Sequence, residues 1–147
     1  MQIIAKTKLY SKEYTINFDL RTRITVIADL SGVGKTLVRK LVANNYDNIA
    51  GYGSEDIGVL RREFSVEEAK FPFTNKLIIL DDFEVLVREI PDLVYAVNGD
   101  RDNYYLIYTR KNSDGIKVTP NGMASLAFNS DTNTFRIKYK YPKGKWA

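Results

Sequence analysis

Cysteine and histidine are both absent from the 147 residues of this chain. Without cysteine the chain forms no disulfide and offers no thiolate ligand to a metal, which fits a reducing compartment. Without histidine it cannot build Ser-His or Cys-His nucleophile systems, and the usual zinc sites are excluded as well. Any hydrolytic chemistry must therefore depend on carboxylates, lysine, arginine, hydroxyl groups and a bound metal ion.

The sequence also lacks an apolar run long enough to cross a bilayer, and lysines interrupt its first apolar residues too early for a secretory signal. We therefore expect a cytoplasmic protein without membrane insertion. Glycine (9) and proline (4) are few, and the 44% hydrophobic and 27% charged content is typical of globular chains. The length predicts one domain over residues 1–147.

Hydrophobic periodicity predicts strands at the start of the chain and then a helix. Residues 2–10 and 13–20 alternate apolar and polar side chains, which indicates an opening β-hairpin. The β-branched run ITVIA at 24–28 is typical of a strand buried on both faces. From Lys35 the apolar residues recur at helical spacing, so we expect a helix that ends near 43–46 and turns Arg39 and Lys40 outward.

The later segments continue this alternation of strands and helices. Residues 48–58 are rich in glycine and predict a loop, whereas 59–71 favours a short helix or strand. Buried strands are expected at 76–80 and 104–109, separated by a helix over 83–99 that breaks at Pro91.

Three closing segments complete the predicted fold. Residues 115–118, 123–129 and 134–141 read as an antiparallel set, with a turn at 130–133 between the last two. The whole order predicts an α/β protein with a parallel core flanked by helices, an N-terminal β-hairpin and C-terminal antiparallel strands.

The loop between the 24–28 strand and the next helix has the chemistry of a phosphate site. Gly32 and Gly34 let successive backbone N–H groups turn inward as an anion nest, and the helix N-terminus adds partial positive charge. Lys35 stands where its ammonium reaches phosphate oxygens, and the hydroxyl of Thr36 is placed to coordinate Mg²⁺.

With these residues in place, DLSGVGKT (29–36) resembles the Walker A motif of the P-loop NTPases, and SGVGKT is particularly similar to the ABC-type ATPases. The resemblance implies a P-loop sheet that binds ATP with Mg²⁺. It also implies phosphate contacts from Ser31, Gly32, Val33, Gly34, Lys35 and Thr36. Asp29 replaces the first Walker glycine. We expect its carboxylate to point away from the ligand, because an inward carboxylate would repel phosphate.

KLIILDD (76–82) resembles the Walker B motif of the same family. By that resemblance, Asp81 binds Mg²⁺ beside Thr36, and Lys35 stabilises the transferred phosphoryl group. Asp82 stands where the ABC-type ATPases carry a water-activating glutamate, so it is the candidate general base. A helix N-cap is the alternative role for Asp82.

Several other residues could act beside the Walker A-like and Walker B-like motifs. Thr109 and Arg110 end the strand that follows Walker B, where they either sense the γ-phosphate or form a plain charge pair. Nothing in the sequence places Arg61 and Arg62 near the site. Tyr10, Tyr14 and Tyr52 are candidates for stacking on a nucleotide base, and the sequence does not select one of them.

Several motifs that define particular groups of P-loop NTPases are missing from the sequence. The N-K-x-D guanine motif, the D-x-x-G switch and the LSGGQ signature are all absent, which favours ATP over GTP and argues against a complete ABC ATPase. We therefore expect a Mg²⁺-dependent ATP-binding protein that hydrolyses ATP slowly or only with a protein partner or a second copy. The alternative is a non-hydrolysing nucleotide-sensing interaction module.

Binding of nucleic acid through the basic C-terminal segment is the least favoured hypothesis. Lys138 and Lys140 alternate with Tyr139 and Tyr141, so a strand would place the lysines on one face and the tyrosines on the other. An edge strand over a core shows the same pattern. Nucleic acid therefore stays a less favoured partner than nucleotide.

Overall fold

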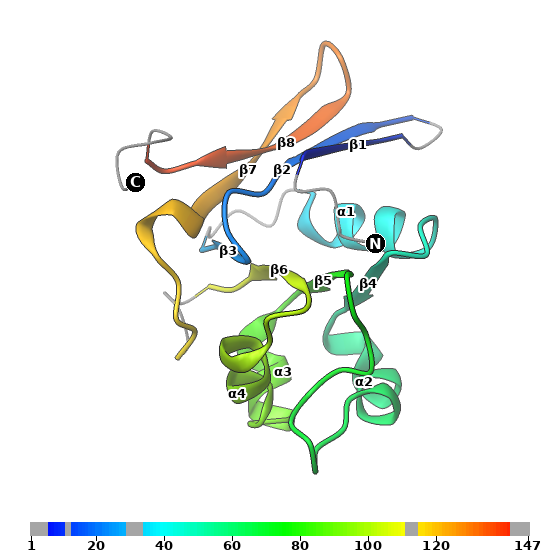
Figure 1. Ribbon diagram of the computed structural model, residues 1–147. Coiled ribbons are helices and arrows are strands. Elements are labelled where there is room, and N and C mark those ends of the chain that lie inside the picture. Colours follow the sequence, from blue (N-terminus) through cyan, green and yellow to red (C-terminus); the bar gives the residue numbers. More distant parts are fainter. Residues whose placement is uncertain (1–5, 11–12, 29–33, 111–114, 142–147) are drawn as a thin grey trace.

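The structure, a computed structural model, describes residues 6–10, 13–28, 34–110 and 115–141. In these residues it is an α/β protein with a curled, mostly parallel sheet and four α-helices (Figure 1). The strands are β1 (Lys6–Tyr10), β2 (Thr15–Asp19), β3 (Ile24–Ile27), β4 (Ile49–Tyr52), β5 (Leu77–Leu80), β6 (Tyr104–Tyr108), β7 (Met123–Asn129) and β8 (Thr134–Tyr139). The helices are α1 (Lys35–Ala43), α2 (Ile57–Glu63), α3 (Phe83–Glu89) and α4 (Leu93–Gly99), with 3₁₀ turns η1 (Ser54–Asp56) and η2 (Pro120–Gly122).

The described strands form one sheet in the order β1-β2-β8-β7-β3-β6-β5-β4. Each adjacent pair in the series β7-β3-β6-β5-β4 is parallel, whereas β1–β2 and β7–β8 are antiparallel hairpins. The two hairpins join through a parallel pairing of β2 with β8. The opening hairpin, the strands expected at 24–28, 76–80 and 104–109, and the antiparallel β7–β8 pair are therefore confirmed.

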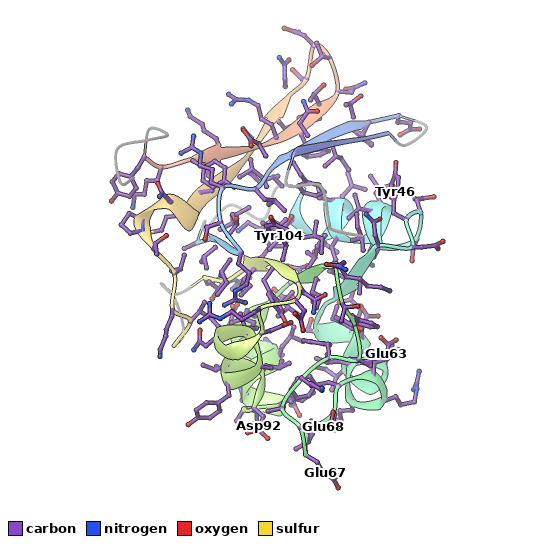
Figure 2. The ribbon with its side chains drawn as sticks, viewed as in Figure 1. Tyr46, Glu63, Glu67, Glu68, Asp92 and Tyr104 are labelled. Carbon is purple, nitrogen blue, oxygen red and sulfur yellow. The ribbon has the colours of Figure 1, made fainter. Side chains whose placement is uncertain are left out.

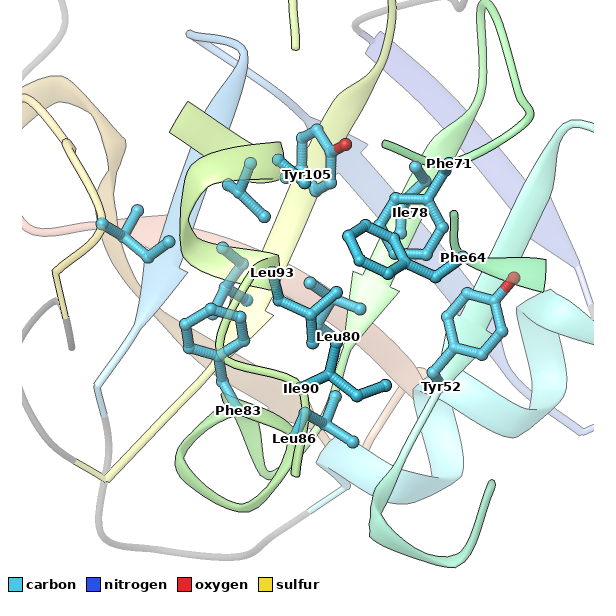
Figure 3. Close-up of a cluster of buried hydrophobic side chains, with 14 of the residues drawn as sticks. Tyr52, Phe64, Phe71, Ile78, Leu80, Phe83, Leu86, Ile90, Leu93 and Tyr105 are labelled. Carbon is cyan, nitrogen blue, oxygen red and sulfur yellow. The ribbon is translucent and has the colours of Figure 1, made fainter. Parts of the chain in front are cut away.

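Both faces of the parallel strands are buried, which is why these strands are nearly uninterrupted apolar runs. On one face Ile78, Leu80 and Tyr105 pack against α2, α3 and α4 (Figure 3). On the other face Ile79 and Leu106 pack against Val38 and Val42 of α1. Pro91 separates α3 from α4, as its missing N–H predicts.

The sheet curls so that its antiparallel part covers the second side of α1. Ile16 and Phe18 of β2, and Phe135 and Ile137 of β8, belong to the same buried cluster as Val38 of α1. In Figure 1, α1 accordingly lies between the β1–β2–β8 strands and the β4–β5 strands. The helix that follows β3 is thus held from two directions.

Several local predictions were wrong. Residues 49–52 form β4 and pair in register with β5, although the glycines of this segment predicted a loop. Residues 115–118 form no strand, because the side chain of Asn98 bonds the Gly115 carbonyl (3.0 Å) and the Lys117 amide (2.8 Å) in place of a partner strand. The β8 strand is not an edge, since β2 and β7 flank it.

Within the described residues, no helix is both long and apolar enough to cross a membrane.

Candidate functional site

The carboxyl ends of the parallel strands bring the predicted motif residues to one edge of the sheet. Ile27 at the end of β3 is opposite Tyr108 of β6, and Leu80 at the end of β5 is opposite Ile107. The segments that follow these strands therefore emerge together. Asp81 follows β5, Thr109 follows β6 and Gly53 follows β4, while Gly34 and α1 are the first described residues after the gap that follows β3 and Ala28.

This edge is also where the chain changes direction across the sheet. From β3 the chain runs through α1 to β4 at the far edge, whereas from β6 it passes β3 to reach β7 on the other side. These connections lie on opposite faces, since Val38 of α1 and Ile116 of the β6–β7 connection belong to different core clusters. In open α/β sheets, ligands bind in the crevice that such a switch point leaves outside the carboxyl ends.

Gly34 and Lys35 lie at the start of α1, on this edge of the sheet. Gly34 adopts a left-handed conformation (φ 77°), and a Cβ at this position would overlap the ring of Phe135. Only glycine therefore fits without strain or displacement of the β8 side chain. Lys35 opens the helix and is 8% exposed. Residues Ser31, Gly32 and Val33, together with Asp29, lie outside the described residues, so their predicted roles stay predictions.

The hydroxyl of Thr36 donates a hydrogen bond of 2.7 Å to Oδ2 of Asp81. The contact joins the start of α1 to the end of β5, although 45 positions separate the two residues. It brings together the two oxygen ligands that the motif pair predicted for Mg²⁺. A hydroxyl and a carboxylate suit this hard cation, which usually takes one or two protein carboxylates and completes its octahedron with water and phosphate.

Asp81 is almost fully buried, and its surroundings decide its protonation. Burial raises the pKa of its carboxyl above the ordinary value of 3.8; the hydrogen bond from Thr36 opposes this, and the charge of Asp82 adds to it. The Asp82 amide also donates to Oδ1 of Asp81 (3.0 Å). A bound cation would remove the penalty on the charged form, so the carboxylate is suited to a metal.

Asp82 lies at the N-cap position of α3 but makes no capping hydrogen bond with its side chain. Its backbone is left-handed (φ 52°, ψ 50°), and its Oδ2 accepts a hydrogen bond of 3.1 Å from the hydroxyl of Ser54. This bond aims the carboxylate at the segment that follows β4. The N-cap alternative therefore holds for the backbone position and not for the side chain.

Arg39 is a residue that the sequence interpretation missed. Its predicted outward orientation is wrong, because the side chain is 3% exposed and binds Glu55 and Asp56. Its Nε also lies 3.7 Å from Oδ2 of Asp81. The predicted exposure of Lys40 is confirmed. The acidic pair after the glycines at 51 and 53 was the only sequence signal that could have revealed a partner for Arg39.

Glu84 is a second missed residue, at the first turn of α3. Its Oε2 accepts hydrogen bonds from the hydroxyl of Thr109 (3.2 Å) and the amide of Arg110 (3.3 Å). The Arg110 guanidinium lies 3.9 Å from Oε1, so the charge pair that the sequence left open is formed. The carboxylate of Glu84 thus marks the end of β6, beside the ends of β3 and β5.

An aromatic group borders the start of α1. The ring of Phe135 lies 5.5 Å from Tyr14 and 4.5 Å from the half-exposed Phe128, centroid to centroid. Of the other tyrosines weighed for base stacking, Tyr52 is buried against Phe71 and donates its hydroxyl to Glu63. Its side chain therefore packs on the face of the sheet opposite α1.

Two cavities lie at the opposite edge of the sheet. One of about 270 Å³ is lined by Arg23, Arg101 and Tyr104 at the amino ends of β3 and β6, and one of about 810 Å³ extends from Phe71 to α4. Neither contains a motif residue. We place the candidate site at the carboxyl edge, where the switch point and the motif residues coincide.

These features define an α/β protein with the candidate site outside the carboxyl ends of a mostly parallel sheet. Comparison of the chain with models of known families, with curated proteins and with solved structures gives no match. Among the described residues, no group of three or more acidic, histidine or cysteine side chains could hold a metal by itself. A cation at Thr36 and Asp81 would therefore need ligands from phosphate or water.

Proposed function

We propose that this protein binds ATP with Mg²⁺ at the carboxyl edge of its sheet, in the manner of a P-loop protein, and turns it over slowly or only with a partner. The observation that carries the proposal is the 2.7 Å hydrogen bond between Thr36 and Asp81. The resemblance to Walker A and Walker B implies that Thr36 and Asp81 bind the same Mg²⁺ ion. Their direct contact in the fold is what such a site requires.

Three further observations support a phosphate ligand at this place. The left-handed Gly34 precedes the first turn of α1, and the N-terminus of a helix attracts anions through its backbone N–H groups and its dipole. Lys35 supplies the positive charge for phosphate oxygens. Thr36 and Asp81 lie at the carboxyl edge beside the switch point between β3 and β6, where open α/β sheets bind ligands.

In the hydrolytic version, water attacks the γ-phosphorus and the bond to the β-phosphate oxygen breaks, which yields ADP and inorganic phosphate. Mg²⁺ bound at Thr36 and Asp81 would neutralise developing charge, as Lys35 does from the helix. Asp82 is the carboxylate that the motif predicts to orient the water. Glu84 competes for this role, because it is bonded to Thr109 at the neighbouring strand end.

A non-hydrolysing module is the second candidate function, and the geometry of Asp82 favours it. Its carboxylate is held by Ser54 and is one methylene shorter than the glutamate of the ABC-type ATPases. Ligand binding at Asp81 would then be transmitted through Asp82 to Ser54 and η1. A partner that contacts η1 would read the bound state.

A thermal-shift screen with ATP, ADP and GTP, each with and without Mg²⁺, tests the binding proposal. At an ATP concentration of one hundred Kd we expect stabilisation by about 2.7 kcal/mol, or roughly 5–10 °C in Tm for a domain of this size. Lys35→Ala should abolish this shift. Lys40→Ala, which removes an exposed charge from the same helix, should retain it. If ATP raised the Tm of both variants equally, the binding proposal would be wrong.

The Thr36 hydroxyl can be tested separately. Thr36→Ser keeps the donor to Asp81 and should retain the Mg²⁺-dependent part of the ATP shift, whereas the nearly isosteric Thr36→Val should lose it. A Thr36→Val variant with an undiminished Mg²⁺ effect would remove this residue from the metal site.

Phosphate release assays then separate hydrolysis from sensing. We expect slow turnover by wild-type protein, and loss of turnover with retained ATP binding in either Asp82→Asn or Glu84→Gln, whichever residue orients water. If neither variant changes turnover, both assignments are wrong. Binding with no turnover in any condition would favour the non-hydrolysing module.

A further inference from the structure

The β8 strand presents a row of cations to solvent. Arg136, Lys138 and Lys140 stand at alternate positions along and just beyond the strand, and all three are exposed. Phe135 and Ile137 point to the other face and are buried in the cluster that contains α1. Because side chains alternate between faces, one side of β8 is core and the other is a basic surface.

None of these three cations has a counter-ion within ion-pair distance among the described residues. The cross-strand neighbours of Arg136 are Asn17 on β2 and Ala127 on β7, and the neighbour of Lys138 on β7 is Ser125. These side chains are short and uncharged, so they leave the cations accessible. We call this surface, formed by Arg136, Lys138 and Lys140, the basic row.

The basic row contributes three positive charges to a protein whose net charge is +4, from 22 basic and 18 acidic residues. The acidic side chains that Figure 2 labels, which are Glu63, Glu67, Glu68 and Asp92, lie at the opposite end of the molecule. These four carboxylates are therefore too far from the row to neutralise it.

We propose that the basic row binds the phosphodiester backbone of a nucleic acid. Consecutive cations of the row are two residues apart, about 6.6 Å along an extended strand. That is close to twice the axial rise of about 3.4 Å per phosphate on one DNA strand. Three cations at this repeat therefore match every second phosphate along one strand.

The surface favours nucleic acid over an anionic membrane. Asn17, Ser125 and Ala127, beside Arg136 and Lys138, are too small to insert into lipid, and Met123, beside Lys140, is partly buried. A flat strand surface instead suits a phosphate chain. Recognition should be independent of base sequence, since the tyrosine within the strand is not available for stacking. Tyr139 lies under the guanidinium of Arg21 (4.2 Å) and contacts Thr25 through its hydroxyl (3.4 Å).

This proposal does not depend on the nucleotide site, and its test is separate. Fluorescence anisotropy with a short labelled single-stranded oligonucleotide and its duplex, between 50 and 200 mM NaCl, measures the slope of log Kobs against log salt. Replacing all three residues by glutamine (R136Q, K138Q and K140Q) should make the slope shallower by about 2 for the single strand and about 2.7 for the duplex. Affinity at the lowest salt should fall roughly tenfold or more.

The matched control removes the same charge elsewhere. Arg62, Arg88 and Lys117 are exposed and form no ion pair in the described part of the chain, so their triple glutamine variant should keep the wild-type slope and affinity within about twofold. Circular dichroism confirms that both variants fold. Equal losses in the two variants would overturn the proposal, as would binding that changes strongly with base sequence. Binding to phosphatidylserine vesicles but to neither oligonucleotide would instead assign the row to a membrane.

Discussion

The guanidinium of Arg39 donates to Asp56 across 2.8 Å while only 3% of the arginine side chain is exposed. The same group binds Glu55, and its Nε approaches Asp81 to 3.7 Å. One buried cation thus ties α1, the turn after β4 and the end of β5 together. A Cβ on Gly53 would lie 2.7 Å from Nη2 of Arg39. A residue without a side chain is therefore needed at position 53 to leave room for the guanidinium.

Replacement of Arg39 by methionine should destabilise the fold. The change leaves two carboxylates and Asp81 without their shared cation, and breaking such a buried pair is costly. Because Glu55 and Asp56 are partly exposed and can regain water, we expect about 2–3 kcal/mol from urea unfolding. Arg61→Met, which breaks the exposed 2.7 Å pair with Glu89, should cost less than about 1 kcal/mol. Similar losses in both variants would contradict the structural role of Arg39.

Asp81→Asn should raise the stability of the protein while removing the Mg²⁺ effect on ATP binding. Burial raises the pKa of this carboxyl, so the folded state binds a proton more readily than the unfolded state. The group therefore loses its contribution to stability as pH rises from 3.8 through the higher folded pKa. The unfolding free energy of Asp81→Asn minus that of wild type should grow over this pH range and stay positive at pH 7. A pH-independent difference would show that burial does not perturb Asp81.

Two tyrosines on β6 should respond oppositely to loss of their hydroxyl groups. The Tyr108 hydroxyl is buried with no hydrogen-bond partner among the described residues, so Tyr108→Phe should leave stability unchanged or raise it by about 1 kcal/mol. The Tyr105 hydroxyl donates to Asp100 at 2.6 Å, so Tyr105→Phe should cost about 1–2 kcal/mol. Chemical denaturation of the two variants checks the sign. A clear loss in Tyr108→Phe would mean that this hydroxyl is satisfied in solution.

Gly34→Ala should be costly even without any ligand. The left-handed backbone disfavours alanine by about 1 kcal/mol, and overlap with Phe135 adds about 1–3 kcal/mol. Gly99→Ala, at the end of α4 with open space around it, should be neutral or slightly stabilising. Thermal unfolding of the two variants measures the contrast. A harmless Gly34→Ala would show that this turn readily adopts another conformation.

The local hydrophobic pattern of the sequence correctly predicted the strands and helices that show it strongly. The β-branched run of β3, the apolar run of β5 and the Pro91 break between α3 and α4 are all confirmed. It failed at β4, because Ala50 and Gly51 interrupt the run of large apolar residues that marks β3 and β5. Pairing with β5 supplies the hydrogen bonds that local propensity does not predict.

Some residues of the candidate site could likewise be predicted from the sequence, whereas others became evident only in the structure. Lys35, Thr36, Asp81 and Asp82 could be selected from the sequence because spacing and residue type define the motif. Arg39 and Glu84 could not, since their partners come from distant segments and charged helical residues usually face water.

By itself the sequence determined which residue types follow which strands: a glycine and a lysine after β3, two aspartates after β5, a threonine after β6. Only the tertiary structure decided that β6 lies between β3 and β5, that α1 is held between two parts of a curled sheet, and that β8 is an interior strand with a basic outer face. The physical reason is that periods of two and 3.6 residues are local properties of the chain. Strand order and side-chain partners depend on contacts between distant segments, and the 2.7 Å bond from Thr36 to Asp81 exists only once those segments have packed.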